Sequence, residues 1–139
     1  MLSLGPRNGL ELARLREAGC QSVSGLDLFS TDPAIHVGDM HAMPFLAKSF
    51  GLIWASHALE HAREPERVFK EIARVLRPGG YLFAAWPTGF KLNWHDFQDY
   101  GNPGDLGRGL ALPRGNLLAC RHTENEGSAE WAALYRVGP

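Results

Sequence analysis

The chain has 139 residues, a hydrophobic share of 45% and a net charge of −1 with the histidines neutral. This length and composition predict one globular domain, and the near-neutral charge gives no overall field that would attract nucleic acid or an anionic membrane. The sequence shows neither an apolar run of membrane-spanning length nor a signal peptide. We therefore expect a cytoplasmic protein whose two cysteines are reduced.

The chain opens with an apolar strand, residues 1–4, and a glycine-bearing turn, Gly5–Gly9. A helical pattern follows, and Gly19 suits the left-handed position that ends a helix. Residues 22–28 then read as a second strand that carries Asp27 near its end. Glycine lets the backbone approach a ligand closely, and a helix N-terminus favours anionic or polar groups, so the turn is a candidate binding site.

The middle of the chain continues the alternation. A weaker third strand is expected over residues 33–37 and an apolar fourth strand over residues 50–55. A helix begins at Pro65, where the missing N–H costs nothing, and ends before the residues 77–80, Arg-Pro-Gly-Gly. Residues 81–86 form a fifth apolar strand. Such alternation predicts a Rossmann-like α/β fold, a mostly parallel sheet flanked by helices.

Residues 88–100 are aromatic and polar, with Phe90, Trp94 and Phe97 at a helical spacing. This spacing favours a packing face or a lid over a site. Residues 101–115 are rich in glycine and proline, so we expect a loop there.

Residues 117–122 and 130–137 read as two further strands, joined by a turn at residues 124–127. Two short strands around a turn of this composition predict an antiparallel β-hairpin.

Five pieces of the first two thirds of the chain carry a resemblance to a known family: LSLGPRNG, SGLDLFS, GDMHAMPF, SFGLIWASHALEHA and PERVFKEIARVLRPGGYLFAAWP. Their order and spacing resemble the successive motifs of the class I S-adenosylmethionine-dependent methyltransferases, particularly the small bacterial type. The resemblance implies a seven-stranded sheet whose last strand is antiparallel and hairpin-joined to its predecessor. It also implies S-adenosylmethionine as the cofactor and transfer of its methyl group to an acceptor, by default a small molecule.

The resemblance divides a single domain, residues 1–139, into three segments. Residues 1–87 would be the cofactor-binding core. Residues 88–115 would be a substrate, lid or partner segment, because the family places substrate-recognition inserts after the fifth strand. Residues 116–139 would be the C-terminal hairpin.

Cofactor-binding roles follow from the resemblance for the first two strands. Asp27 would hold the two ribose hydroxyls, and Leu28 would pack against the adenine. The turn would lie under the methionine part of the cofactor, with contacts from Gly5, Pro6, Arg7 and Gly9.

Further roles follow for the next two strands. Asp39 would accept a hydrogen bond from the adenine amino group, and Met40 would lie against the ring. Ala55 and Ser56 would line the pocket near the methyl group. His57 follows them and is the first candidate for a catalytic general base, if the acceptor must lose a proton. Weaker candidates for the base lie in the aromatic segment: His95, Asp96 and Tyr100.

Three positions depart from the family's pattern. Ser3 stands where an acidic residue is usual, Arg7 replaces a glycine, and Gly51 stands where aspartate is common. The helices that usually precede the first strand are not in the sequence. These departures keep an alternative open: a catalytically degenerate module that acts in binding or in homo-oligomeric assembly. Apolar surface without those helices could be covered by a second copy, so a homodimer is a further hypothesis.

Two other site types compete for the same residues. The sequence His57-Ala58-Leu59-Glu60-His61 matches the H-x-x-E-H pattern of some zinc peptidases, but that pattern needs one long helix and this one follows a strand. We therefore expect no metal. A nicotinamide cofactor would require G-x-G-x-x-G, and the turn Gly5–Gly9 does not have that spacing.

Overall fold

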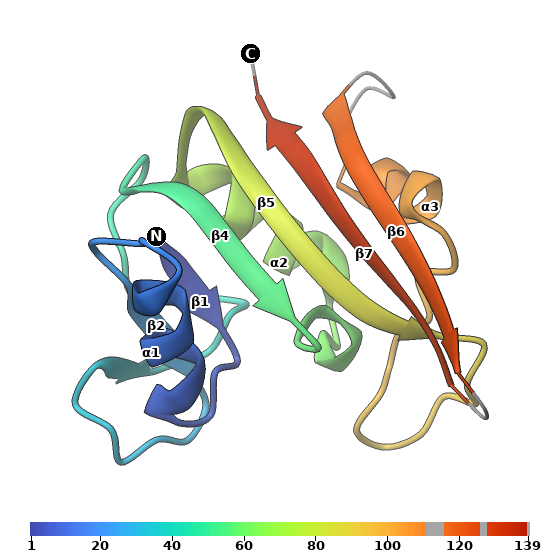
Figure 1. Ribbon diagram of the computed structural model, residues 1–139, viewed down its shortest axis with the longest axis horizontal. Coiled ribbons are helices and arrows are strands. Elements are labelled where there is room, and N and C mark those ends of the chain that lie inside the picture. Colours follow the sequence, from blue (N-terminus) through green and yellow to red (C-terminus); the bar gives the residue numbers. More distant parts are fainter. Residues whose placement is uncertain (111–115, 126–127, 139) are drawn as a thin grey trace.

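The computed structural model describes residues 1–110, 116–125 and 128–138, which form one seven-stranded sheet with helices on both faces (Figure 1). The strand order is β3-β2-β1-β4-β5-β7-β6. The first five strands pair in parallel, whereas β7 is antiparallel to both β5 and β6. The predicted mostly parallel sheet with a terminal antiparallel hairpin is confirmed. The strands are β1 (Leu2–Leu4), β2 (Ser24–Asp27), β3 (Ile35–Val37), β4 (Phe50–Ser56), β5 (Leu76–Thr88), β6 (Leu117–Asn125) and β7 (Ser128–Val137).

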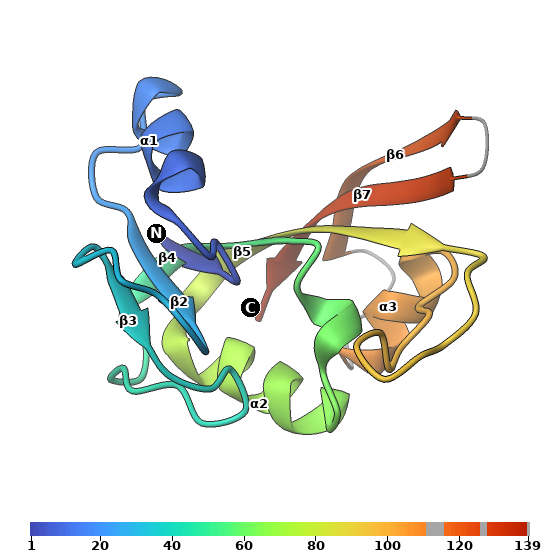
Figure 2. The same ribbon diagram turned by 90° about the horizontal axis from the view of Figure 1, so that it is seen from below.

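The helices divide unequally between the two faces of the sheet. Figure 2 shows α1 (Gly9–Glu17) on one face, and α2 (Pro65–Val75) with α3 (Pro103–Gly109) on the other. A short 3-10 helix, η1 (Leu59–His61), follows β4. None of the described helices is long and apolar enough to span a membrane.

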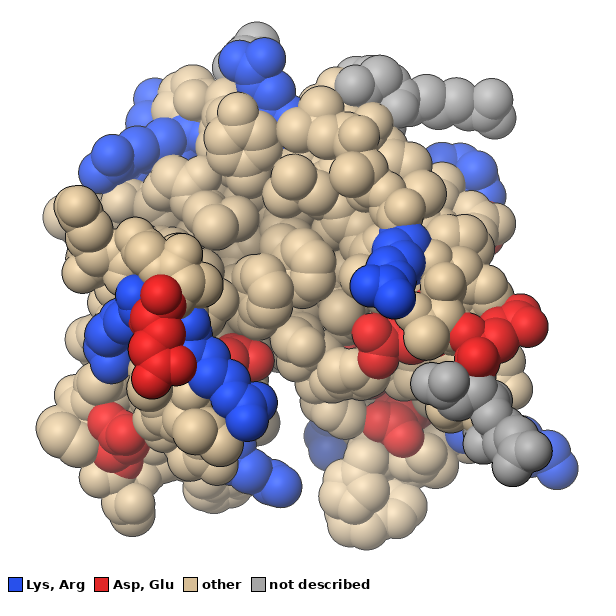
Figure 3. All heavy atoms as spheres, viewed as in Figure 1, with Lys and Arg blue, Asp and Glu red and all other residues tan. Residues whose placement is uncertain are grey.

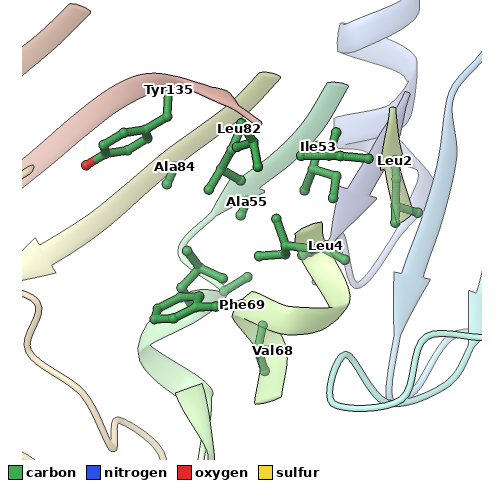
Figure 4. Packing of buried hydrophobic residues seen from close by; sticks show 14 of the residues in the cluster. Leu2, Leu4, Ile53, Ala55, Val68, Phe69, Leu82, Ala84 and Tyr135 are labelled. Atoms are coloured by element: carbon green, nitrogen blue, oxygen red, sulfur yellow. The ribbon is translucent and has the colours of Figure 1, made fainter. Parts of the chain in front are cut away.

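The main core lies between the sheet and α2. Side chains alternate between the faces of a strand, so Leu2 and Leu4 point into this core (Figure 4). Ser3, between them, points toward α1, where it contacts Glu11. A smaller core under α1 contains Leu12, Leu15, Val23 and Ile35. The sheet is therefore covered on both sides near β1, where the cofactor motifs lie.

Farther from β1, the face that carries α1 is open. Trp54 on β4 stacks on Phe83 of β5 with ring centroids 3.8 Å apart, and Leu134 of β7 lies opposite Phe83. Figure 3 shows few charged side chains over the middle of this face. Trp54 also packs against the smaller core under α1, and all three side chains are only partly buried.

One predicted loop contains a helix. Asn102 caps α3 by accepting hydrogen bonds from the backbone N–H groups of Gly104 and Asp105, and the Asp105 carboxylate accepts from the Asn102 backbone N–H. This capping box and Pro103 at the first helical position start the helix in spite of three glycines. The prediction of a loop was therefore wrong for residues 103–109, and residues 111–115 lie outside the described part.

The aromatic stripe is not a helix. Residues 90–100 have no regular secondary structure. Asn93 accepts hydrogen bonds from the backbone of His95 and Asp96, and Asp99 accepts from Gly89 and Gly101. These short polar side chains bind nearby N–H groups and so compete with helix formation, which the spacing alone did not reveal.

Strand lengths differ modestly from the predictions. β2 and β3 are shorter than expected, whereas β5 begins at Leu76, because this residue pairs with Phe50 before a register shift. The hairpin strands extend to Asn125 and from Ser128. The predicted turn at 124–127 therefore falls partly on residues 126–127, which lie outside the described part.

Candidate functional site

The candidate site lies where the parallel strands end. The chain runs from β1 to β2 and β3 on one side and then crosses to β4 on the other, so the strand order reverses at β1. Open α/β sheets bind ligands in the crevice at the carboxyl ends of the strands around such a point. This edge is the lower one in Figure 1, and the space-filling view shows a notch there (Figure 3).

The turn after β1 contains two residues with left-handed backbone conformation. Gly5 has φ +70°, and a Cβ there would lie 3.1 Å from the Cβ of Ala58. Arg7 also has a positive φ of 47°, which is uncommon for a residue with a side chain. Asn8 caps α1 by accepting a hydrogen bond from the Leu10 backbone N–H at 3.0 Å. The N-terminus of α1 is thereby placed at the crevice.

Asp27 ties the turn to the end of β2. One carboxylate oxygen accepts from the Arg7 backbone N–H at 2.8 Å, and the other accepts from that of Phe29 at 3.0 Å. An ionised carboxylate has about four acceptor positions, so each oxygen can still accept a further hydrogen bond. Asp27 can therefore receive a vicinal diol without giving up its structural contacts.

An apolar hollow of a size to hold an adenosine group lies beside Asp27. Leu28, Phe29 and Val37 are 56%, 81% and 62% exposed and line the same hollow, so they form an exposed apolar patch. The hollow is lined by Arg7, Leu28, Phe29, Ser30, Thr31 and Val37. Phe29 and Val37 were not among the predicted site residues, although Phe29 follows Leu28 directly in SGLDLFS.

Asp39 follows β3 and comes two residues after Val37, which lines the same hollow. The Gly38 backbone N–H donates to the Asp27 carbonyl at 2.9 Å, which joins this loop to β2. Burial alone would raise the pKa of the Asp39 carboxyl, but hydrogen bonds from the backbone and ring of His41 hold it below its usual value. Asp39 is thus a charged acceptor, whereas the Met40 side chain packs against the main core.

The residues at the end of β4 do not all face the crevice. Ala55 is fully buried in the main core, so it offers no exposed surface to a ligand. Ser56 faces a second hollow between α1 and β4, which is lined by Asn8, Leu10, Glu11, Arg14, Leu15, Ala18, Trp54 and Ser56. The turn borders both hollows, because Arg7 lines the first and its neighbour Asn8 lines the second.

His57 lies between two carboxylates. Its Nδ1 is 3.5 Å from Glu60 and its Nε2 is 2.8 Å from Glu130 of β7. These contacts, with Glu60 the stronger influence, raise the pKa of His57 to about 9 against the opposing effect of partial burial. At neutral pH the ring is mainly cationic, so it donates hydrogen bonds and has no lone pair with which to accept a proton.

The weaker candidates for a base are also engaged elsewhere. The Tyr100 hydroxyl donates to the Leu59 carbonyl at 2.9 Å, and burial raises its pKa far above the usual value. Asp96 lies 3.1 Å from the His61 ring, and the His95 ring packs against Trp94. These contacts place the aromatic segment against η1 at the rim of the site.

The structure separates the two histidines of the H-x-x-E-H pattern. His57 has φ +51° directly after β4, whereas His61 is the last residue of η1 and bonds to residues 95–96. The two rings therefore do not share one face of a long helix, which a peptidase zinc site of this type requires. Among the described residues, no three His, Cys, Asp or Glu side chains are grouped to hold a metal ion.

Comparison with known proteins adds a family to this geometry. A family model described as "Methyltransferase domain" matches residues 2–84. Methyltransferase GfsG of Streptomyces halstedii is 37% identical over 81 residues, which are 57% of this chain and 26% of that protein. The chain matches about a quarter or less of the length of the curated relatives.

Two solved structures share the whole fold. The [4+2]-cyclase SpnF superposes with a TM-score of 0.78 at 16% identity, covering 99% of this chain and 74% of that one. The 1,6-didemethyltoxoflavin-N1-methyltransferase of Burkholderia thailandensis, solved with S-adenosylhomocysteine, gives 0.77 at 13% identity, covering 99% and 71%. At these identities the likeness shows the fold alone.

Proposed function

Because this chain belongs to the methyltransferase domain family, in its class I S-adenosylmethionine-dependent branch, we propose that it transfers a methyl group from S-adenosylmethionine to a small molecule. The observation that carries the proposal is Asp27 at the switch point of the sheet, with acceptor capacity on both oxygens beside an apolar hollow. The matched relatives are much longer, so the acceptor and the full activity are part of the proposal.

The residues around the first hollow fit the nucleoside part of the cofactor. Asp27 would accept hydrogen bonds from the ribose hydroxyls. Leu28 and Val37 would cover the adenine ring, and their exposed apolar surface supports this role. The charged Asp39 would accept from the adenine amino group.

The bound cofactor supplies a sulfonium-bound methyl group, which is already activated for displacement. The chain therefore has to position the acceptor and exclude water rather than activate a leaving group. Cationic His57 is placed to connect β4 with Glu130 on β7 and so to fix the rim of the site. We assign it this positioning role, and a role as general base would first require loss of its proton.

The acceptor would enter beside the aromatic segment, residues 88–100. The backbone N–H groups of Phe97 and Gln98 donate to the Glu60 carbonyl at 2.8 and 3.1 Å, which fixes the segment next to the end of β4. Its aromatic side chains, of which Trp94 is 77% exposed, suit an uncharged or aromatic small molecule.

Calorimetric titration with S-adenosylmethionine and S-adenosylhomocysteine tests the proposal. The wild type is expected to bind both ligands, and Asp27→Ala is expected to lower the affinity at least about tenfold, because bonds to a charged acceptor are lost. Glu66→Ala, an exposed carboxylate on α2, is the matched control and should bind as the wild type does. If the folded wild-type protein binds neither ligand, the proposal is wrong.

A further inference from the structure

The second hollow carries a carboxylate that the nucleoside site does not use. Ser3 is fully buried on β1 and points toward α1, where its hydroxyl donates a hydrogen bond to the Glu11 carboxylate. Glu11 lies in the first turn of α1 and lines the hollow. The contact fixes the carboxylate between α1 and the sheet, close to the turn that follows β1.

The same wall carries a positive charge. Arg14 is one helical turn after Glu11 and also lines the hollow. Neither side chain takes part in a salt bridge within the described residues. Across from them, the buried indole nitrogen of Trp54 has no hydrogen-bond acceptor in the described part of the chain. The hollow is therefore lined by one anion, one cation and one indole whose buried N–H has no acceptor in the described part of the chain.

We propose that this hollow receives the amino-acid end of S-adenosylmethionine, with Glu11 binding its ammonium group and Arg14 facing its carboxylate. An α-amino acid is a zwitterion, so a carboxylate and a guanidinium on neighbouring helical turns match its two charges. The turn borders both hollows, so an elongated ligand lying across Arg7 and Asn8 would place its two ends at Leu28 and Glu11. This inference rests on the proposed function, and it assigns Glu11 and Arg14 to the amino-acid end of the cofactor.

Glu11 also explains how Ser3 can stand on β1 at a position where the family usually has an acidic residue. Ser3 cannot supply a negative charge, but its hydroxyl donates to a carboxylate that reaches the same place from the helix. The charge is thus provided by α1 instead of β1. Replacing Glu11 with glutamine removes this charge and keeps an acceptor for Ser3, which preserves the local packing.

The test compares two ligands by calorimetry. S-Adenosylmethionine carries the amino-acid end on a sulfonium, whereas 5′-methylthioadenosine has the same nucleoside with an uncharged thioether and no amino-acid end. For Glu11→Gln, the affinity for S-adenosylmethionine is expected to fall about tenfold while that for 5′-methylthioadenosine stays unchanged, because a charge-assisted contact is lost at one end only. Glu17→Gln on the exposed side of the same helix should alter neither affinity.

Three results would overturn the inference. If Glu11→Gln binds S-adenosylmethionine as tightly as the wild type, Glu11 does not contact the ammonium group. If both ligands lose affinity equally in protein that melts normally, Glu11 supports the fold of the turn instead. If the wild type binds neither ligand, the proposed function itself fails, and this inference fails with it.

Discussion

Asp27 and His57 illustrate two different uses of charge at one edge of the sheet. Asp27 accepts two backbone hydrogen bonds and keeps acceptor capacity toward the crevice. His57 is enclosed by Glu60 and Glu130 and holds its proton. The first is therefore suited to bind a ligand, and the second is suited to bind other parts of the protein.

The His57 contacts predict a pH dependence of stability. The pKa of His57 is about 9 in the folded protein and about 6.5 when unfolded, so its ion pairs stabilise the fold fully below pH 6.5. That stabilisation is lost as the pH rises from 6.5 through 9. The wild type should therefore melt at a higher temperature than His57→Gln at pH 6.5, and this difference in melting temperature should shrink as the pH rises to 9. A difference between the two proteins that stays constant from pH 6 to 10 would contradict the ion pairs.

The sequence predicted part of the site for a physical reason. Asp27 and the turn Gly5–Gly9 lie beside the ends of adjacent strands, and alternation of strands and helices places such ends at one edge. The pairing of Ser3 with Glu11 depends on how α1 packs across the sheet, and no spacing rule gives that. The state of His57 depends on Glu130, 73 residues away, which only the antiparallel pairing of β7 brings near.

Among the elements, α3 is fixed to the sheet by buried side chains. The Tyr135 hydroxyl of β7 donates to the Pro103 carbonyl at 2.7 Å, and the Trp86 indole donates to the Gly101 carbonyl at 3.1 Å. Both aromatic side chains are almost fully buried, so neither carbonyl can exchange its partner for water easily. Tight anchoring of α3 sets where the preceding aromatic segment leaves the site.

Removing one anchor should cost measurable stability. Tyr135→Phe leaves the ring in place and is expected to lower the free energy of unfolding by about 1–2 kcal/mol, because a buried carbonyl loses its donor. Denaturant unfolding measures this change. Tyr81→Phe, at a tyrosine of β5 that is 41% exposed, is the control and should change stability by less than about 0.5 kcal/mol. Equal effects of the two substitutions would show that the Pro103 contact is not made.

The elements also show where sequence patterns are reliable. Strand β4 and the one-sided helix α2 were predicted with nearly correct bounds, because burial imposes a pattern on the sequence, whereas β5 begins at Leu76 rather than at residue 81. α3 was missed because Gly104, Gly107 and Gly109 concealed a capping box that was present in the sequence. The helical spacing of Phe90, Trp94 and Phe97 did not produce a helix, because spacing says nothing about competition from Asn93 and Asp99 for the nearby N–H groups.

At the scale of the whole molecule, the open sheet face is the feature that the described chain leaves uncovered. Phe83 and Leu134 face the same side as Trp54, and the few charges over this face do not oppose association. The homodimer hypothesis from the sequence therefore stays a prediction. Sedimentation equilibrium at micromolar concentration should give twice the mass of 15.3 kDa, and a mass of one chain across the concentration range would count against it.

We propose that one cofactor spans the two hollows at the carboxyl edge of the sheet. A crystal structure of the protein soaked with S-adenosylhomocysteine tests it most directly. We predict the ribose hydroxyls within hydrogen-bond distance of Asp27, the adenine between Leu28 and Val37, and the amino group at Glu11. Density for the ligand at another face, or in the crevice with its amino-acid end directed away from α1, would contradict the account.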